Sequence, residues 1–467
     1  DTDAENAELA LSLYDMYSTQ FQLQTDYITA LYPQLLVKDK MTRFITSRAI
    51  VGGMNHYVDT RNAVLTYLVD KYKANYNEEV IDTRLRTNQA SRKKDTPQNV
   101  SNRSAVALTF ARFNALKNLD EAFITEIFNF LITSGLTDYN ETILQDMVDA
   151  GVLIIDKHGA QHTAALYTLI DGYMSKLVSN TVSQHRVRES LVIYIGAVAK
   201  HLPSDDARLL QIVDKLFEVL TTPSEPVQES VAECLAKLAP KLVNVETYLR
   251  KCLTMCINAD SYALRCGGAF GIAGLIKGLR PLALKKYDFV MEELEKAATN
   301  KQNEFNREGA SIAYGTLSNM IGRIFEPWVF QIVQKLLDAL ADGSIHVRNA
   351  TLETAKKIMS QLTSNGVNVV LPTLLKSLDN TDRKWRARAG SVELLGAMAY
   401  CQPQQLGQCL PIIVPKLAQL MTDTQQQIQK CAKDAMNVIC GCTRNPEITK
   451  LVPVLLQAID DPIKNTA

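Results

Sequence analysis

The sequence lacks the short motifs that mark the common catalytic folds. It contains no G-x-S-x-G turn, no H-E-x-x-H zinc motif and no G-x-G-x-x-G dinucleotide fingerprint. Its longest apolar run, residues 267–276, falls well short of the roughly 20 residues that a membrane-spanning helix needs. These absences favour a protein without a catalytic centre, a cofactor or a membrane span.

The charge and the cysteines exclude further classes. The 467 residues carry 50 basic and 50 acidic side chains, so phosphate binding would need a local patch rather than a general basic coat. All nine cysteines lie from Cys234 onward. Cys252 and Cys256 stand four apart without the second pair or the histidine of a zinc site, and the same holds for Cys440 and Cys442. We expect buried thiols in a reducing compartment.

What the sequence does contain is an internal repeat of about forty residues. One full unit, residues 384–422, has an apolar stripe, a stop at Pro403 and a second apolar stripe. An apolar residue followed by arginine or glutamine, or an arginine alone, marks the first helix of each unit at Val187-Arg188, Val227-Gln228, Leu264-Arg265, Arg307, Val347-Arg348, Trp385-Arg386 and Ile428-Gln429. These markers are 37 to 43 residues apart, which predicts two amphipathic helices per unit.

This period is typical of HEAT repeats, and aspartates in the turns, such as Asp342 and Asp423, add to the resemblance. One helix pair cannot bury its own stripe, so the units must stack. The predicted fold class is therefore all-α, a HEAT-repeat α-solenoid in which antiparallel helix pairs form a superhelical stack. We divide the chain into irregular helical repeats (1–100), further helical repeats (101–186) and regular HEAT repeats (187–467). Because the last repeat stops before its second helix, we expect the parent chain to continue.

The N-terminal third is less periodic. Helices are expected over residues 4–22, 27–36, 123–131 and 143–155. The polar stretch 77–100 is expected to be a long loop.

A glycine-rich run resembles a phosphate loop. Gly268, Gly271 and Gly274 are followed by Lys277, but no strand precedes them and the G-K-[ST] ending is absent. We expect these glycines to mark a close crossing of helices.

A second group loosely resembles a ligand site. Asp156, His158 and His162 surround Gly159. We expect the glycine to break the helix and to leave these side chains in a solvated loop, not in a metal site.

Two groups of cations are candidate contacts for RNA phosphate or an acidic partner. The first, the basic cluster, comprises Arg383, Lys384, Arg386 and Arg388. The second, the basic loop, comprises Arg84, Arg86, Arg92, Lys93 and Lys94. The alternative for the basic cluster is a solvated ridge beside a core-packed Trp385, with ion pairs to Asp379 and Asp382. The alternative for the basic loop is ordinary solvation.

Several segments together resemble one family. They are VQESVAEC (227–234), GIAGLIKG (271–278), REGA (307–310), FEP (325–327) and AGSVELLGAMAYC (389–401). These segments are similar to the central region of the general-control-nonderepressible translational activators, very large eukaryotic HEAT scaffolds. The similarity is close from about residue 187 to 462 and thin before about residue 95. The segment LGQCLPIIVPK (406–416) also resembles the HEAT domain of fungal translation elongation factor three.

The resemblance implies a function. The family binds translating ribosomes, including stalled and collided ones, and works with an ABC-F ATPase partner that engages the elongation-factor-like region. It helps uncharged tRNA to activate the initiation-factor-two alpha kinase during amino-acid starvation. The segment that docks this kinase has no match here, so the kinase would be reached through a region outside this chain. We expect a cytoplasmic, ribosome-associated, non-catalytic scaffold.

Two other classes of function stay open at this point. A HEAT adaptor, such as a nuclear transport receptor or a phosphatase scaffold, would bind partner peptides in a concave groove and would ignore ribosomes. An enzyme is the third class, for which the glycine run is the one indication. Absence of nucleotide binding by the purified chain would remove it.

Overall fold

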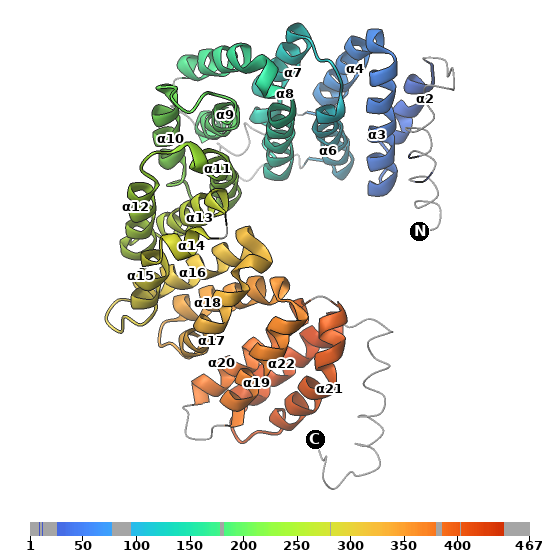
Figure 1. The fold of residues 1–467 in the computed structure, drawn as a ribbon. Coiled ribbons are helices and arrows are strands. Elements are labelled where there is room, and N and C mark those ends of the chain that lie inside the picture. Colours follow the sequence, from blue (N-terminus) through green and yellow to red (C-terminus); the bar gives the residue numbers. More distant parts are fainter. Residues whose placement is uncertain are drawn as a thin grey trace, which may run out of the picture. The chain divides into compact units, whose positions relative to one another are not determined.

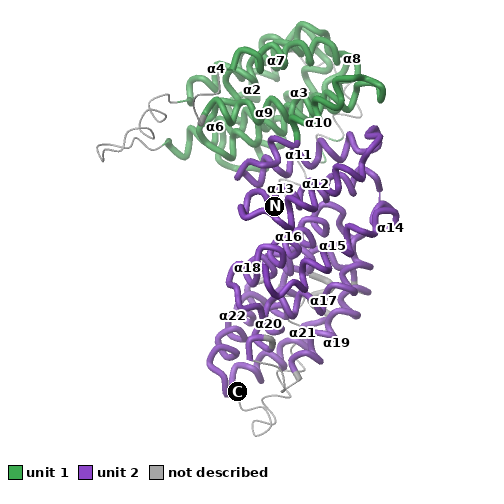
Figure 2. The backbone as a smooth tube through the Cα atoms, turned by 90° about the vertical axis from the view of Figure 1, so that its left-hand side faces the viewer, with its two compact units in different colours: residues 1–216 green, residues 217–467 purple. Residues whose placement is uncertain are grey.

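The computed structural model describes residues 26–76, 95–177, 182–280, 282–379, 385–401 and 403–442, together with Leu9 and Ser12. Within these residues every element is helical and none is a strand, which confirms the all-α prediction (Figure 1). The chain divides into two compact units, residues 1–216 and 217–467 (Figure 2). The helix expected over residues 4–22 lies outside the described residues, apart from Leu9 and Ser12.

Unit 1 contains three of the helices expected in the N-terminal third. Its helices are α2 (Asp26–Leu35), α3 (Lys40–His56), α4 (Arg61–Ala74), α6 (Pro97–Arg112), α7 (Glu121–Thr133), α8 (Glu141–Lys176), α9 (Val182–Ala199) and the first part of α10 (Arg208–Val219). α2, α7 and α8 match the expected segments. Of the expected loop 77–100, residues 77–94 lie outside the described residues, but α6 already begins at Pro97. Thr96 caps it by accepting from the Asn99 N–H at 3.1 Å, so the predicted loop ended too late.

Unit 2 is built from helix pairs, as predicted. The first helices of the pairs are α11 (Glu225–Leu238), α13 (Tyr262–Leu279), α16 (Glu304–Ile321), α18 (Ile345–Gln361), α20 (Trp385–Ala397) and α22 (Gln426–Cys442). The second helices are α12 (Val245–Asn258), α15 (Phe289–Ala298), which follows the short α14 (Ala283–Lys286), α17 (Glu326–Leu340), α19 (Ser364–Asp379) and α21 (Pro403–Leu420). Each first helix packs on the first helix of the next pair, and the second helices pack against them (Figure 1). The core of unit 2 lies between these two layers.

Helix α13 approaches its neighbours closely because it is rich in glycine. A Cβ atom at Gly268 would lie 2.6 Å from the carbonyl oxygen of Cys252, and one at Gly271 would lie 2.5 Å from the Cys252 thiol. A Cβ atom at Gly274 would overlap the carbonyl of Ala232 on α11. The expected close helix crossing is confirmed, and the glycines are part of a helix and not of a phosphate loop.

The solvated loop expected around Gly159 is wrong. Residues 141–176 form one long helix, α8, with non-helical backbone angles at His162. His158 and His162 are buried, and the His158 ring nitrogen Nε2 lies 3.1 Å from the carbonyl oxygen of Asn114. Gly159 lies inside this helix, and a Cβ atom there would lie 2.7 Å from His201 Cδ2. The glycine therefore admits a neighbouring side chain and does not end the helix.

Candidate functional site

An arginine near the start of a first helix joins its repeat to the next one. Arg307 Nε and Nη2 donate to the two carboxylate oxygens of Asp342 at 2.6 and 3.0 Å. Arg307 Nη1 donates to the carbonyl of Asn300, in the turn before α16, at 2.7 Å. Asp342 also accepts from the Ser344 N–H at 2.8 Å. The guanidinium thus holds its own turn and the following turn together, and we call this arrangement a turn clamp.

The clamp sets the charge state of its aspartate. Burial alone would raise the pKa of the Asp342 carboxyl, but the hydrogen bonds from Arg307 and Ser344 lower it below its ordinary value. Both side chains of the ion pair are largely buried, at 16% exposed for Arg307 and 11% for Asp342.

The clamp recurs at a fixed spacing along the chain. Arg388 Nη2 donates to Asp423, 35 residues later, at 2.6 Å. In unit 1, Arg103 Nε donates to Asp138, also 35 residues later, at 2.9 Å. Both aspartates accept a backbone N–H two residues further on. The Asp turn of the sequence is therefore the acceptor half of an inter-repeat contact.

Glutamine can replace arginine in the clamp. Gln228 Nε2 donates to the carbonyls of Thr222 at 2.6 Å and Ala263 at 2.8 Å, the latter again 35 residues away. Gln429 Nε2 donates to the carbonyl of Asp423 at 2.6 Å. An amide thus keeps the hydrogen bonds of the turns without the ion pair.

The sequence marker of one repeat was assigned to the wrong arginine. Arg388, and not Arg386, occupies the clamp position of α20. It follows Arg348 by 40 residues and precedes Gln429 by 41. Trp385-Arg386 fits the apolar-arginine pattern, but the side chain that reaches the next turn is that of Arg388.

The basic cluster is divided by this arrangement. Arg388 is 18% exposed and is oriented toward Asp423, in the following turn rather than the preceding one. Arg386 is exposed, and its guanidinium carbon lies 5.1 Å from the centre of the Trp385 ring. Trp385 is itself 41% exposed, so the alternative that packed it into the core is wrong.

The remaining cations of the two predicted groups are not among the described residues. Arg383 and Lys384 of the basic cluster lie outside the described residues. The same is true of the whole basic loop, Arg84, Arg86, Arg92, Lys93 and Lys94. Their contact with RNA or an acidic partner stays a prediction.

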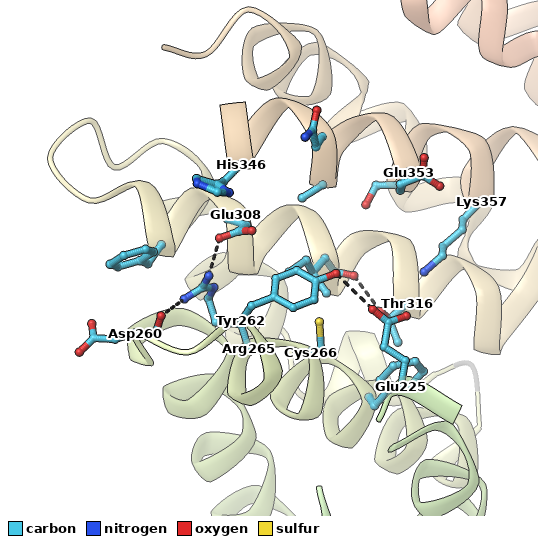
Figure 3. A pocket seen from close by; sticks show the side chains of 16 residues that line it. Glu225, Asp260, Tyr262, Arg265, Cys266, Glu308, Thr316, His346, Glu353 and Lys357 are labelled. Carbon is cyan, nitrogen blue, oxygen red and sulfur yellow. Dashed lines mark hydrogen bonds and ion pairs between the residues drawn. The ribbon is translucent and has the colours of Figure 1, made fainter. Parts of the chain in front are cut away.

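A polar groove that the sequence did not reveal follows helix α16 in unit 2 (Figure 3). It has a volume of about 440 Å³. Its floor is α16, one wall is α13 and the other is α18, and the side chains stand one helical turn apart along each of them. The lining includes Tyr262, Cys266 and Phe270 from α13, Glu308, Ile312 and Thr316 from α16, and His346, Glu353 and Lys357 from α18.

One end of the groove is closed by a buried ion pair. Arg265 and Glu308 are 4% and 5% exposed and lie 2.5 Å apart. Arg265 also donates to the carbonyls of Ala259 and Asp260, each at 2.8 Å, so it forms the turn clamp of this repeat with a glutamate as its acceptor.

The groove offers binding groups and no activated nucleophile. Burial raises the pKa of the Cys266 thiol to about 11, so it is protonated at neutral pH. Tyr262 donates its hydroxyl to Glu225 at 3.2 Å, and burial raises the pKa of that hydroxyl well above its ordinary value. Figure 3 shows Glu353 and Lys357 on α18 opposite Tyr262 and Cys266 on α13. These groups can accept or donate hydrogen bonds to a bound segment, and they do not form a nucleophile–base pair.

The cysteines of unit 2 are mostly core residues. Cys252 and Cys256 are buried, as expected, and burial raises the pKa of Cys252 to about 12. Cys440 is exposed, contrary to the expectation. In the described part of the chain no group of three or more His, Cys, Asp or Glu side chains is placed to hold a metal ion. No described helix combines the length and the apolarity that crossing a bilayer requires.

The helix pairs and their turn clamps define the chain as a HEAT-repeat α-solenoid. Residues 1–200 match the family described as "Stalled ribosome sensor GCN1, HEAT repeats", and residues 265–436 match "EF3 N-terminal HEAT repeat". The chain therefore belongs to the GCN1 family, as a stretch of HEAT repeats that includes the EF3-like region.

Two relatives give the extent of this similarity. The chain is 36% identical over 463 residues to "eIF-2-alpha kinase activator GCN1" of Dictyostelium discoideum, which covers 98% of this chain. It is 35% identical over 469 residues to "Stalled ribosome sensor GCN1" of Homo sapiens, which covers 100% of this chain. The chain spans 17% of the length of each relative. Among solved structures, yeast importin-beta (Kap95p) aligns with 93% of this chain and 53% of its own, at 12% identity and a TM-score of 0.43.

Proposed function

We propose that this chain is a non-catalytic part of a scaffold that binds stalled or collided ribosomes and promotes activation of the initiation-factor-two alpha kinase in amino-acid starvation. The observation that carries the proposal is the continuous similarity of the chain to relatives named "Stalled ribosome sensor GCN1" and "eIF-2-alpha kinase activator GCN1". Stacked repeats suit this role because many weak contacts along one solenoid add up through a high effective concentration.

The proposed ribosome contact within this chain is the basic cluster. Arg386 and Trp385 are exposed side by side at the start of α20, and Arg383 and Lys384 precede them directly in the sequence. An exposed guanidinium beside an indole can contact both a phosphate and the face of a base. The basic loop, residues 84–94, is a second candidate contact on the basis of its sequence.

The other partners are proposed from the same family membership. An ABC-F ATPase would dock on the EF3-like repeats, residues 265–436, and the kinase would be reached through a region outside this chain. The site of action would be the cytoplasm, on the ribosome.

Cosedimentation with purified ribosomes over a salt series tests the proposal. The test variant reverses Arg383, Lys384 and Arg386 to glutamate and leaves Arg388 in place, because Arg388 holds Asp423. The control variant, here called the control triple, reverses Lys301, Lys430 and Lys433, which are exposed in the same unit.

We expect the wild-type chain and the control triple to cosediment alike. The test variant should bind more weakly and with a shallower salt dependence, because fewer phosphates are neutralised. Equal binding and equal salt slopes for the two variants would remove the basic cluster from the interface. Failure of the wild-type chain to cosediment at any salt concentration would reject ribosome binding by this segment.

A further inference from the structure

The carboxylates of unit 2 are unevenly distributed between the two kinds of turn. The turns inside the repeats, which join a first helix to its second helix, lie in stretches that contain no aspartate or glutamate. These stretches are residues 234–245, 261–287, 309–325, 354–378 and 394–422. Three of the turns between repeats carry aspartates, Asp260, Asp342 and Asp423, whereas residues 299–303 contain Lys301 and no carboxylate. The turns inside the repeats are therefore the kind that consistently lacks negative charge.

Cations occupy three consecutive turns of the carboxylate-free kind. Lys241 follows α11, Arg280 follows α13 with Lys285 and Lys286 on α14, and Arg323 follows α16. The last four side chains are exposed. Within the described residues, Arg280, Lys285 and Arg323 have no carboxylate at ion-pair distance. The nearest carboxylates in the sequence have other partners, because Asp288 accepts from the Phe289 N–H and Glu326 accepts from the N–H and the hydroxyl of Thr363. The charge of these three cations is therefore not neutralised by an ion pair within the described residues.

An exposed aliphatic side chain accompanies the cations in each of these turns. Val243 is 94% exposed, Leu282 is 72% exposed and Ile324 is 47% exposed. Each follows a cation by one or two residues. A single exposed apolar side chain is ordinary on a protein surface, but the same pair in three successive repeats forms a pattern. Cations near a helix C-terminus stabilise the helix dipole, whereas the aliphatic side chains have no such role.

The three turns lie along one edge of unit 2. At their C-terminal ends, α13 and α11 are in contact, since a Cβ atom at Gly278 would overlap the carbonyl of Ala236. At their N-terminal ends, α13 and α16 are joined by the Arg265–Glu308 pair, so these two helices also run in parallel. Parallel neighbours are about 8–10 Å apart, and the turns therefore follow one another at that interval.

We propose that these turns (residues 239–244, 280, 282–287 and 322–325), here called the turn strip, bind an acidic protein segment that carries apolar side chains. Its carboxylates would face Arg280, Lys285, Lys286 and Arg323, and its apolar side chains would cover Val243, Leu282 and Ile324. Single-stranded RNA is the less suitable occupant, because its bases stack on aromatic side chains whereas the apolar members of the strip are aliphatic. The proposal uses unit 2 alone and does not depend on ribosome binding.

Fluorescence anisotropy with the full 467-residue chain tests this proposal. The probe is a short labelled peptide in which glutamates and leucines are mixed. An all-glutamate peptide of equal length tests the need for apolar side chains, and a single-stranded RNA of equal charge tests the alternative occupant. One variant reverses Arg280, Lys285 and Lys286 to glutamate. A second variant changes Val243, Leu282 and Ile324 to serine and leaves the charge unchanged. The control triple supplies the same change of charge elsewhere in unit 2.

We expect the mixed peptide to bind the wild-type chain more tightly than either the all-glutamate peptide or the RNA does. Each of the two turn-strip variants should bind the mixed peptide about tenfold or more weakly than the wild-type chain does, while the control triple should bind it as the wild type does. Circular dichroism of every variant checks that the helices are retained. Equal binding of the mixed and all-glutamate peptides, tighter binding of RNA, or an equal loss in the control triple would each overturn the proposal. None of these outcomes bears on cosedimentation with ribosomes, so the two proposals fail separately.

Discussion

The turn clamp makes a strong prediction about coupling between repeats. Removing either Arg307 or Asp342 should destabilise unit 2, and removing both should cost much less than the two single losses added together. Arg307 donates two charge-assisted hydrogen bonds to Asp342 and a third to the carbonyl of Asn300. Removal of one partner therefore leaves a largely buried charge or carbonyl without its hydrogen bond.

The size of the effect follows from burial. A fully buried ion pair loses about 3–5 kcal/mol when one partner is removed, and a hydrogen bond to a charged group contributes about 1.5–3 kcal/mol. Arg307 and Asp342 are 16% and 11% exposed and not fully buried, so we expect their loss to cost slightly less than the value for a fully buried pair. We expect Arg307→Leu, which removes every donor of the clamp, and Asp342→Asn each to cost about 2–3 kcal/mol, with a coupling energy of about 2 kcal/mol in the double-mutant cycle.

Native-state hydrogen exchange is the appropriate assay. Repeat proteins can unfold in parts, so a single unfolding free energy from denaturant titration can mix several transitions. Exchange of amides in α16 and α18 reports the opening free energy of the two clamped repeats directly.

The matched control is the exposed pair Arg250–Glu246, at 2.7 Å within one helix and 58% and 55% exposed. Its coupling energy should be about 0.3–0.5 kcal/mol. If the Arg307–Asp342 pair showed no larger coupling than this surface pair, the turn clamp would have no role in joining the repeats.

Two further predictions concern unit stability. Gly274→Ala should destabilise the chain by about 1–3 kcal/mol, because its Cβ atom would overlap the Ala232 carbonyl. Gly172→Ala should stabilise α8 by about 1 kcal/mol, because nothing lies within 4 Å of a Cβ atom there. Urea midpoints of the two variants that move in the same direction would contradict this prediction. Burial lowers the pKa of His158, so below about pH 6.5 the unfolded chain binds a proton that the folded chain does not, and stability should fall as the pH drops from about 7 to 5.5. His158→Gln should flatten this dependence in urea unfolding, and an unchanged slope would show that His158 does not contribute to it.

The repeat period predicted the architecture correctly. Two local motifs gave wrong predictions, at positions where a contact with a distant residue determines the structure. Gly159 looked like a helix break, but it lies inside α8, where its missing side chain makes room for the ring of His201. Trp385-Arg386 looked like the repeat marker, and Arg388 performs that role. Intrinsic propensity describes a residue in isolation, whereas these positions depend on atoms from turns elsewhere in the chain.

The two candidate surfaces also differ in how much of each could be predicted from the sequence. The basic cluster could be recognised from four nearby cations, but the sequence could not show that Arg388 is held by Asp423. The groove along α16 could not be recognised, because its lining residues come from three helices that are far apart in the chain.

The amino-acid sequence by itself determined that this chain is helical, that its helices come in pairs, and that the pairs recur about every forty residues. It could do so because an apolar stripe is a local property of each helix. The tertiary structure alone decided which arginine clamps which turn and which side chains share the groove and the turn strip. Those contacts join residues about one repeat apart, and they exist only once the helices are stacked in register.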